Sequence, residues 1–380
     1  MAEPAPPTLE GDECEMIWVT DHASSAEAVN ARPLAAALLR GKSPEEAAAV
    51  ASALFSLCGV AQRHAVRAAC GAARGETFPL DVATERELVI ESARLHLWRI
   101  LLDWPMLFDV APVRERFGGL YRDLGRVRSD RDAFDMGGQL LNLVGSEWLG
   151  GFFSIPREPR NLTEFMSVCG RGGRIGGVLA RLIEAGASDP MEDPVPVLPS
   201  MGAEDLARAV PGGWPDAAFC RAPHLHGKVC ETGPLARQVG HPLVGRLVSQ
   251  RHRIAARLFA RMVDLSDCAS RLRHPLPDDL SPLVDATPLG EHSGFARVET
   301  ARGVLIHSVR LKDDLIDDYA IVAPTEWNFR PGGVFELEGA GWAAPDEAYA
   351  RWRVKALALA LDPCVAFDVS VVAGEALDHA

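Results

Sequence analysis

Three long segments with helical periodicity constrain the fold of this chain more than any other feature. "KSPEEAAAVASALFSLCGVAQRHAVRAACGAA" begins with a cap at Ser43, a first-turn proline at Pro44 and a capping-box acid at Glu46, and we expect a bend at Gly59. "ERELVIESARLHLWRILLDW" is expected to end at Pro105. "GRLVSQRHRIAARLFARMVDLSDCASRL" is expected to form one helix, with an apolar stripe made by Ile254, Leu258, Met262 and Leu265. These segments predict a helical core.

The pattern changes after residue 290. "GFARVETARGVLIHSVRL" and "LIDDYAIVAPTEW", joined by the turn "KDD", predict antiparallel strands, and "PDEAYARWRVKALALALD" returns to helix. The expected fold class is α+β, mainly helical, with a smaller antiparallel β region. We expect a single domain over residues 1–380, and the acidic, proline-rich stretch 187–205 marks where an internal break would fall.

Charge and composition exclude several classes of protein. The net charge of −13 argues against a nucleic-acid-binding surface. No stretch has the apolar length of a membrane span, and "MAEPAPPTLEGDECEM" carries acids and prolines where a secretory signal would be basic and then apolar. We therefore expect a cytoplasmic protein. Its eight cysteines include no pair two or three residues apart, so a site that uses two of them must join distant segments.

Two cysteines are placed where a metal site is worth considering. Cys364, in "LALDPCVAFDVSVV", lies between the rigid Asp362-Pro363 step and an alternating apolar run that predicts a strand. Cys58 lies on the first helix, six residues before His64. Judged by residue type alone, each cysteine is more typical of a buried structural thiol. Two charged pairs at turns, Glu231 with Arg237 and Glu299 with Arg302, are interpreted as structural ion pairs on the same grounds.

Several segments together resemble the large subunit of nickel–iron hydrogenases, in the same order along most of the chain. "SLCGVAQRH" is similar to that family's RxCGxCxxxH motif, "LHLWRILLDW" to its HxxxLHALDW-like helix, and "GKVCETGPLAR" to GKxxEVGPLAR. "VETARGVLIHSVRLKDDLIDDYAIVAPTEWNFRP" resembles VEAPRGxLGH followed by PTTWNxxP, and "LDPCVAFDVSV" resembles the terminal FDPCxxCAVHV. Residues 110–215 are covered least. The resemblance implies the large-subunit fold.

In that family each terminal motif supplies two thiolates, and the second of each pair bridges nickel to iron. Cys58 and Cys364 match the first positions, whereas Ala61 and Phe367 occupy the bridging positions and cannot donate to a metal. Ser370 replaces the histidine that ends the family's mature chain. The resemblance therefore implies that no mature binuclear site forms, and we expect no nickel.

Other matched positions are retained. Asp103, Arg302 and Asp362 correspond to residues that form a polar canopy over the metals in the large subunit, and Arg302 is suited to donate to a cyanide nitrogen. His64 matches the histidine of the first motif and is a further candidate ligand. Glu10, in "LEGD", resembles the proton-handling glutamate of RIEGH.

A chain that keeps two thiols and loses the bridging pair resembles the HupK/HoxV group of hydrogenase expression and formation proteins. That resemblance implies a non-catalytic scaffold, which transiently holds an iron carrying cyanide and carbon monoxide on Cys58 and Cys364. Its expected partners are the hydrogenase large subunit precursor, the HypC-type chaperone and other Hyp maturation proteins. The alternative is a metal-free structural chaperone of hydrogenase subunits. An active hydrogenase is the weakest hypothesis because both bridging thiolates are missing.

Overall fold

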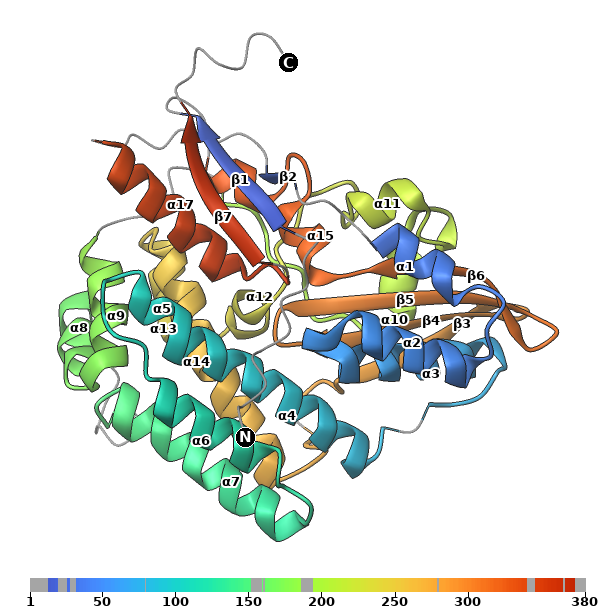
Figure 1. Cartoon of the computed structure of the whole chain (residues 1–380), viewed down its shortest axis with the longest axis horizontal. Helices are drawn as coiled ribbons and strands as arrows, with labels where there is room; N and C mark the ends of the chain where they lie inside the picture. Colours follow the sequence, from blue (N-terminus) through green and yellow to red (C-terminus); the bar gives the residue numbers. More distant parts are fainter. Residues whose placement is uncertain are drawn as a thin grey trace, which may run out of the picture.

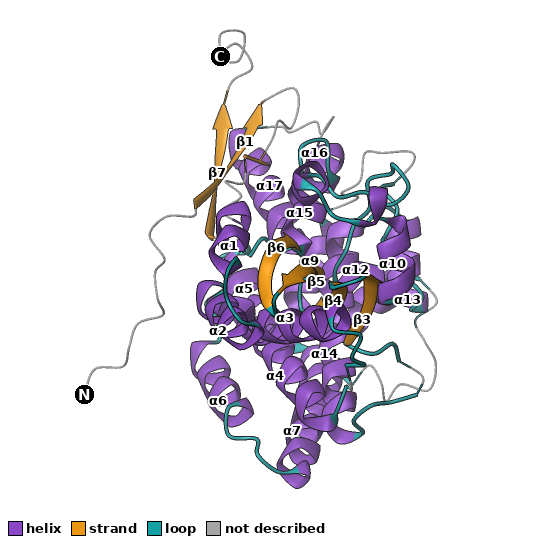
Figure 2. Cartoon of the chain, turned by 90° about the vertical axis from the view of Figure 1, so that its right-hand side faces the viewer, coloured by secondary structure: helices purple, strands orange, loops and turns teal. Residues whose placement is uncertain are grey.

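Helices form most of the computed structural model, and a four-stranded antiparallel sheet lies among them (Figures 1 and 2). The structure describes residues 13–19, 26–27, 32–78, 80–151, 159, 161–185, 194–278, 280–339, 346–364 and 366–372. The helices are α1 (Arg32–Leu39), α2 (Pro44–Leu54), α3 (Gly59–Ala73), α4 (Val82–Trp98), α5 (Trp104–Met106), α6 (Arg114–Leu124), α7 (Asp130–Asn142), α8 (Leu162–Gly170), α9 (Gly173–Glu184), α10 (Ala203–Ala209), α11 (Ala217–Arg221), α12 (Pro234–Gln238), α13 (Pro242–Ser249), α14 (Arg253–Arg273), α15 (Pro324–Phe329), α16 (Val334–Gly339) and α17 (Glu347–Leu361). None of the described helices is long and apolar enough to cross a membrane.

The antiparallel sheet runs in the order β3 (Val284–Gly290), β4 (Ser293–Thr300), β5 (Gly303–Lys312) and β6 (Leu315–Val322). β4 to β6 are the predicted strands, whereas β3 begins before residue 290 and was not predicted. Asp313 and Asp314 make the β5–β6 turn with φ of 50° and 65°, the left-handed values that a two-residue hairpin turn requires. Helix α3 packs closely on β4: a Cβ on Gly294 would lie 2.0 Å from the carbonyl oxygen of Ala69.

The predicted caps and stripes account for the main helices. Ser43 and Glu46 form the expected capping box at the start of α2. The stripe of α14 is buried in the largest core cluster, which α4, α7, α9 and α17 also line. The prediction of one helix over "GRLVSQ…CASRL" was wrong. Arg251 adopts a left-handed φ of 64° and separates α13 from α14, so the chain turns there instead of continuing.

Helix α4 does not stop where proline was expected to end it. A π-helical segment, Arg99–Asp103, follows α4, and α5 then continues the helical path through Pro105 to Met106. Pro105 has no N–H to donate, and the carbonyl of Leu101, four residues before it, accepts instead from the N–H of Val113. π-helical turns are frequent at functional sites, and this one carries Asp103.

The two ends of the chain meet in a second, three-stranded sheet. β1 (Glu13–Val19) pairs in parallel with β7 (Ala366–Val372) and antiparallel with β2 (Ala26–Glu27), and Figure 1 shows β1 and β7 side by side. β7 is the strand predicted after Cys364. Helix α17, capped by Asp346, leads into it and packs against α14. This arrangement brings the segment after α17 back to the β4–β5 end of the antiparallel sheet, where the candidate site lies.

Candidate functional site

Cys58 and Cys364 face each other in the folded chain. Cys58 ends a short 3₁₀ turn, Ser56–Cys58, and precedes the first residue of α3 with non-helical φ and ψ of −135° and 33°. Cys364 lies between α17 and β7. The side chain of Cys58 hydrogen-bonds with that of Cys364, and both side chains are half-buried. The fold therefore joins two thiols from opposite ends of the sequence.

The backbone around Cys364 is held from several sides. Asp362 ends α17 in the left-handed region with φ of 57°, and Pro363 fixes the next φ. The Cys364 N–H donates to Oγ1 of Thr325 in α15 at 3.3 Å. The Pro363 carbonyl accepts from Arg99 at 3.2 Å. These contacts fix the direction from which the Cys364 thiol approaches Cys58.

A small pocket contains both thiols. Its other walls come from α3, the β4–β5 turn and the β6–α15 connection, namely Gln62, Thr300, Arg302, Leu305, Ala323 and Pro324. The free space is about 10 Å³, which is about enough for one water molecule. Within the described part of the chain, the Arg302 guanidinium makes one contact, from Nε to Asp362 Oδ1 at 3.3 Å. Gln62 Nε2 lies 3.7 Å from Cys58 Sγ, and Gln62 Oε1 is buried without a hydrogen-bond partner among the described residues.

The canopy residues form one buried charge network. Asp362 is 1% exposed and contacts three guanidinium groups: Arg99 Nε at 2.7 Å, Arg261 Nη1 at 2.9 Å and Arg302 Nε at 3.3 Å. Burial alone would raise the pKa of this carboxyl, but Arg302, Arg99 and Arg261 hold it far below its ordinary range. Asp103 joins the network through Arg99 Nη1 at 2.6 Å and does not line the pocket.

The Cys58 thiol is neutral in this environment. The hydrogen bond with Cys364 raises the pKa of Cys58 well above its ordinary value, burial and the charge of Glu91 raise it further, and Arg302 lowers it. A metal binds the thiolate, so metal binding at this pair would have to release protons.

The remaining matched residues do not add a donor. His64 is buried, with 4% of its surface exposed, and its Nε2 lies 2.8 Å from Glu87 Oε2. It does not line the pocket. The Ala61 side chain is buried beside the sheet, and Phe367 packs against the main core. Among the residues that the structure describes, no group of three or more histidine, cysteine or acidic side chains could hold a metal ion. Glu10 and the side chain of Ser370 lie outside the described residues.

The two charged pairs interpreted as ion pairs have other partners. Glu231 binds Arg253 and Arg257, each at 2.7 Å, in the interior. Arg237 binds Asp264 at 2.7 Å and Glu299 at 2.8 Å. The pairing of Glu231 with Arg237, and of Glu299 with Arg302, was therefore wrong, because the side chains that meet come from elements packed together in three dimensions.

Sequence reasoning missed several residues of the site, among them Gln62, Arg99 and Thr325. Gln62 lies four residues after Cys58, a spacing that places both on one helix face, so periodicity was a signal for it. Arg99 precedes Asp103 by the same spacing and forms an ion pair with it. Thr325 carries no such local signal, because its partner is close only in the fold.

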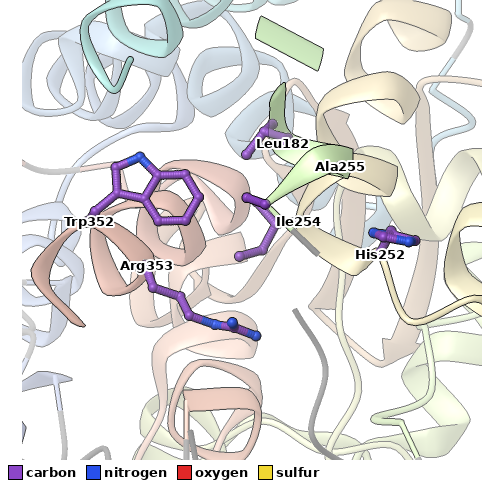
Figure 3. Close-up of a pocket in the computed structure, with 7 residues that line it drawn as sticks. Leu182, His252, Ile254, Ala255, Trp352 and Arg353 are labelled. Atoms are coloured by element: carbon purple, nitrogen blue, oxygen red, sulfur yellow. The ribbon is translucent and has the colours of Figure 1, made fainter. Parts of the chain in front are cut away.

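A second hollow lies between the end of α9, the start of α14 and α17, where Figure 3 shows Leu182, Ile254 and Trp352. Its free space is also about 10 Å³, and its lining contains neither a thiol nor a carboxylate. The dithiol pocket is therefore the stronger candidate for a metal-containing ligand.

Known proteins resemble this chain in sequence and in fold. A family model described as nickel-dependent hydrogenase matches residues 246–341. The hydrogenase expression/formation protein HupK of Rhizobium leguminosarum bv. viciae is 31% identical over 87% of this chain and 88% of its own length. HoxV of Cupriavidus necator, with the same description, is 30% identical over 88% of this chain and 90% of its own. The Ni-Fe-Se hydrogenase from D. vulgaris Hildenborough in the reduced state has a similar fold, with a TM-score of 0.57 at 17% identity over 90% of this chain and 92% of that chain. The predicted large-subunit-like fold is confirmed.

Proposed function

Because this chain belongs to the family of hydrogenase expression/formation proteins that includes HupK and HoxV, and so has a role in hydrogenase maturation, we propose that it is a scaffold for an iron cargo. The cargo is an iron that carries cyanide and carbon monoxide, held transiently on Cys58 and Cys364 for delivery to the large subunit precursor. In this proposal the chain is a non-catalytic accessory protein, its partners are the precursor and Hyp-type maturation proteins, and it takes no nickel.

One observation carries the proposal: two thiols from distant segments face each other beside an arginine whose terminal nitrogens have no partner among the described residues. Low-spin iron with three diatomic ligands needs only two or three more donors, and soft thiolates suit it. The guanidinium of Arg302 can donate to a cyanide nitrogen. With Ala61 and Phe367 at the bridging positions, the site offers two thiolates in place of four, which favours release of the cargo.

The size of the pocket sets a condition on loading. An iron with three diatomic ligands is larger than a space of about 10 Å³, so the lining side chains must move apart when it binds. Both cysteines are half-buried as residues. Leu305 is the bulkiest apolar side chain in the lining, and we expect Leu305→Ala to increase the fraction of protein that carries iron.

Infrared spectroscopy tests the proposal. The protein is purified anaerobically from a host with active hydrogenase maturation, and the cyanide and carbonyl stretching bands are recorded. We expect the bands in the unaltered chain and in Cys220→Ala, which removes a half-buried thiol outside the pocket. We expect Cys58→Ala and Cys364→Ala to lose them.

Two results would count against the scaffold. Bands that persist in the Cys58→Ala, Cys364→Ala double variant would place the iron elsewhere. Bands absent from the unaltered chain, with association to the large subunit precursor retained, would indicate the metal-free chaperone instead.

A further inference from the structure

A carboxylate from a neighbouring helix binds the backbone directly after Cys58. Glu91, part-buried on α4, accepts the N–H of Val60 through Oε2 at 2.7 Å and the N–H of Ala61 through Oε1 at 3.1 Å. These N–H groups lie in the first turn of α3, where they have no partner within the helix. The positive end of the helix dipole favours a negative charge at this position.

The same backbone also packs closely against α2. A Cβ on Gly59 would lie 2.6 Å from the carbonyl oxygen of Ser52, so the two helices meet there with no room for a side chain. The segment from Cys58 to Ala61 is therefore held by contacts with both α2 and Glu91 of α4.

These contacts of residues 58–61 with α2 and Glu91, here called the clamp, lie next to the residue whose thiol they orient, Cys58. Cys58 lies outside the helical φ and ψ region, so the helix does not by itself dictate where its side chain points. The position of residues 59–61, the next three along the chain, sets the direction of the Cys58 side chain. On the other side of the pocket, Thr325 holds the Cys364 backbone, so each thiol has its own support from a different helix.

We infer that Glu91 is a positioning residue, which holds the start of α3 so that the Cys58 thiol faces Cys364 at the separation that one iron can bridge. The inference rests on the proposed function for the cargo and on the structure for the geometry. Burial raises the pKa of Glu91 to about 7. The N–H groups of Val60 and Ala61 and the charges of Arg302 and Arg63 act in the opposite direction and lower it. The chain thus keeps an acid here although its charged form is costly to bury.

Helix α4 offers a matched control for this role. Glu87, one turn before Glu91, also binds α3, but its partners are the side chains of Arg63 at 2.6 Å and His64 at 2.8 Å. Glu87→Ala removes a contact between the same two helices and leaves the N–H groups of Val60 and Ala61 with their partner.

Disulfide formation between Cys58 and Cys364 measures the positioning without iron. The full chain is equilibrated with glutathione and glutathione disulfide; two thiols give up two electrons and two protons, and one glutathione disulfide becomes two glutathione molecules. Peptide mass spectrometry gives the fraction in which the two cysteines are joined, and hence their effective concentration.

We expect Glu91→Ala to lower that effective concentration roughly tenfold, which corresponds to about 1.4 kcal/mol. Glu91→Gln, which keeps one acceptor oxygen, is expected to recover part of the loss, and Glu87→Ala to stay within about twofold of the unaltered chain. If Glu91→Ala does not fold, the effective concentration in Glu91→Gln is compared with that in Glu87→Ala, and this comparison alone tests the inference. Equal effective concentrations in the Glu91 and Glu87 variants would overturn the inference.

A second measurement separates this inference from the proposed function. The cyanide and carbonyl bands are recorded for the unaltered chain and Glu91→Ala, and weaker bands in the variant are expected. If the unaltered chain shows no bands, the scaffold proposal fails, while the disulfide comparison still decides whether Glu91 positions Cys58.

Discussion

Asp362→Asn tests how much the ion pairs of one buried carboxylate with three arginines contribute to the stability of the fold. Asparagine has nearly the same shape and tolerates the left-handed backbone at this position, so the substitution removes charge and little else. The carboxylate contacts guanidinium nitrogens at 2.7, 2.9 and 3.3 Å. At an effective dielectric constant of about 20, a pair of charges about 4 Å apart is worth about 4 kcal/mol.

Burying the carboxylate offsets much of that attraction, and removing one partner of a buried pair costs about 3–5 kcal/mol. Arg99 keeps its ion pair with Asp103, whereas Arg261 and Arg302 lose their ion-pair partner among the described residues, so we expect the free energy of unfolding to fall by about 4–5 kcal/mol at pH 7. Urea denaturation followed by tryptophan fluorescence measures it. Asp314→Asn is the control, because Asp314 also has a positive φ but pairs with Arg74 at the surface, 2.7 Å away, and should cost at most about 1 kcal/mol.

The pH dependence provides a second check on Asp362. Its pKa is lower in the folded chain than in the unfolded one, so its contribution to stability is present above the unfolded pKa and is lost as the pH falls. The difference in the free energy of unfolding between the unaltered chain and Asp362→Asn should therefore be constant from pH 8 to about 5 and become smaller below about pH 4. A difference under about 1 kcal/mol at pH 7, or one that grows on acidification, would refute the reasoning.

Three further outcomes are expected from the described contacts. Burial lowers the pKa of His307 to about 3, whereas the histidine of the unfolded chain takes up a proton at higher pH. Between pH 7 and 5 the free energy of unfolding of the unaltered chain should therefore fall by about 2 kcal/mol relative to His307→Gln, as measured by urea denaturation. Gly294→Ala would place a Cβ 2.0 Å from a backbone oxygen of α3 and should destabilise by about 1–3 kcal/mol, whereas Gly177→Ala meets nothing within 4 Å and should not destabilise. In native protein at pH 8, iodoacetamide should react more slowly at the buried cysteines than at the half-buried Cys220 and Cys364, and equal rates in peptide mass spectrometry would contradict this. The buried cysteines among the described residues are Cys70, Cys169, Cys230 and Cys268.

Local order was readable from the sequence because it depends on neighbours in the chain. The Ser43 capping box, the apolar stripe of α14 and the alternation in β4 to β6 each follow from contacts a few residues apart. The ordered motifs also indicated the large-subunit-like fold and singled out Cys58 and Cys364. Even locally, the left-handed turn at Arg251 escaped prediction, since no glycine or proline marks it.

Contacts between distant segments had no such signal. The packing of distant elements decided three contacts of this kind. They are the ion pair of Arg237 with Glu299, the contact of His64 with Glu87, and the hydrogen bond from the Cys364 N–H to Thr325. Motif matching placed Asp103 in the canopy over the metals, and the structure places it behind Arg99, away from the pocket.

The sequence alone determined which donors remain: one cysteine in each terminal motif, and no thiol at positions 61 and 367. Only the tertiary structure decided that these two thiols meet, because their encounter depends on the clamp around Cys58, the left-handed end of α17 and the sheet edge between them. Residue type is a local property, whereas the distance between two side chains at opposite ends of a chain is set by everything packed between them.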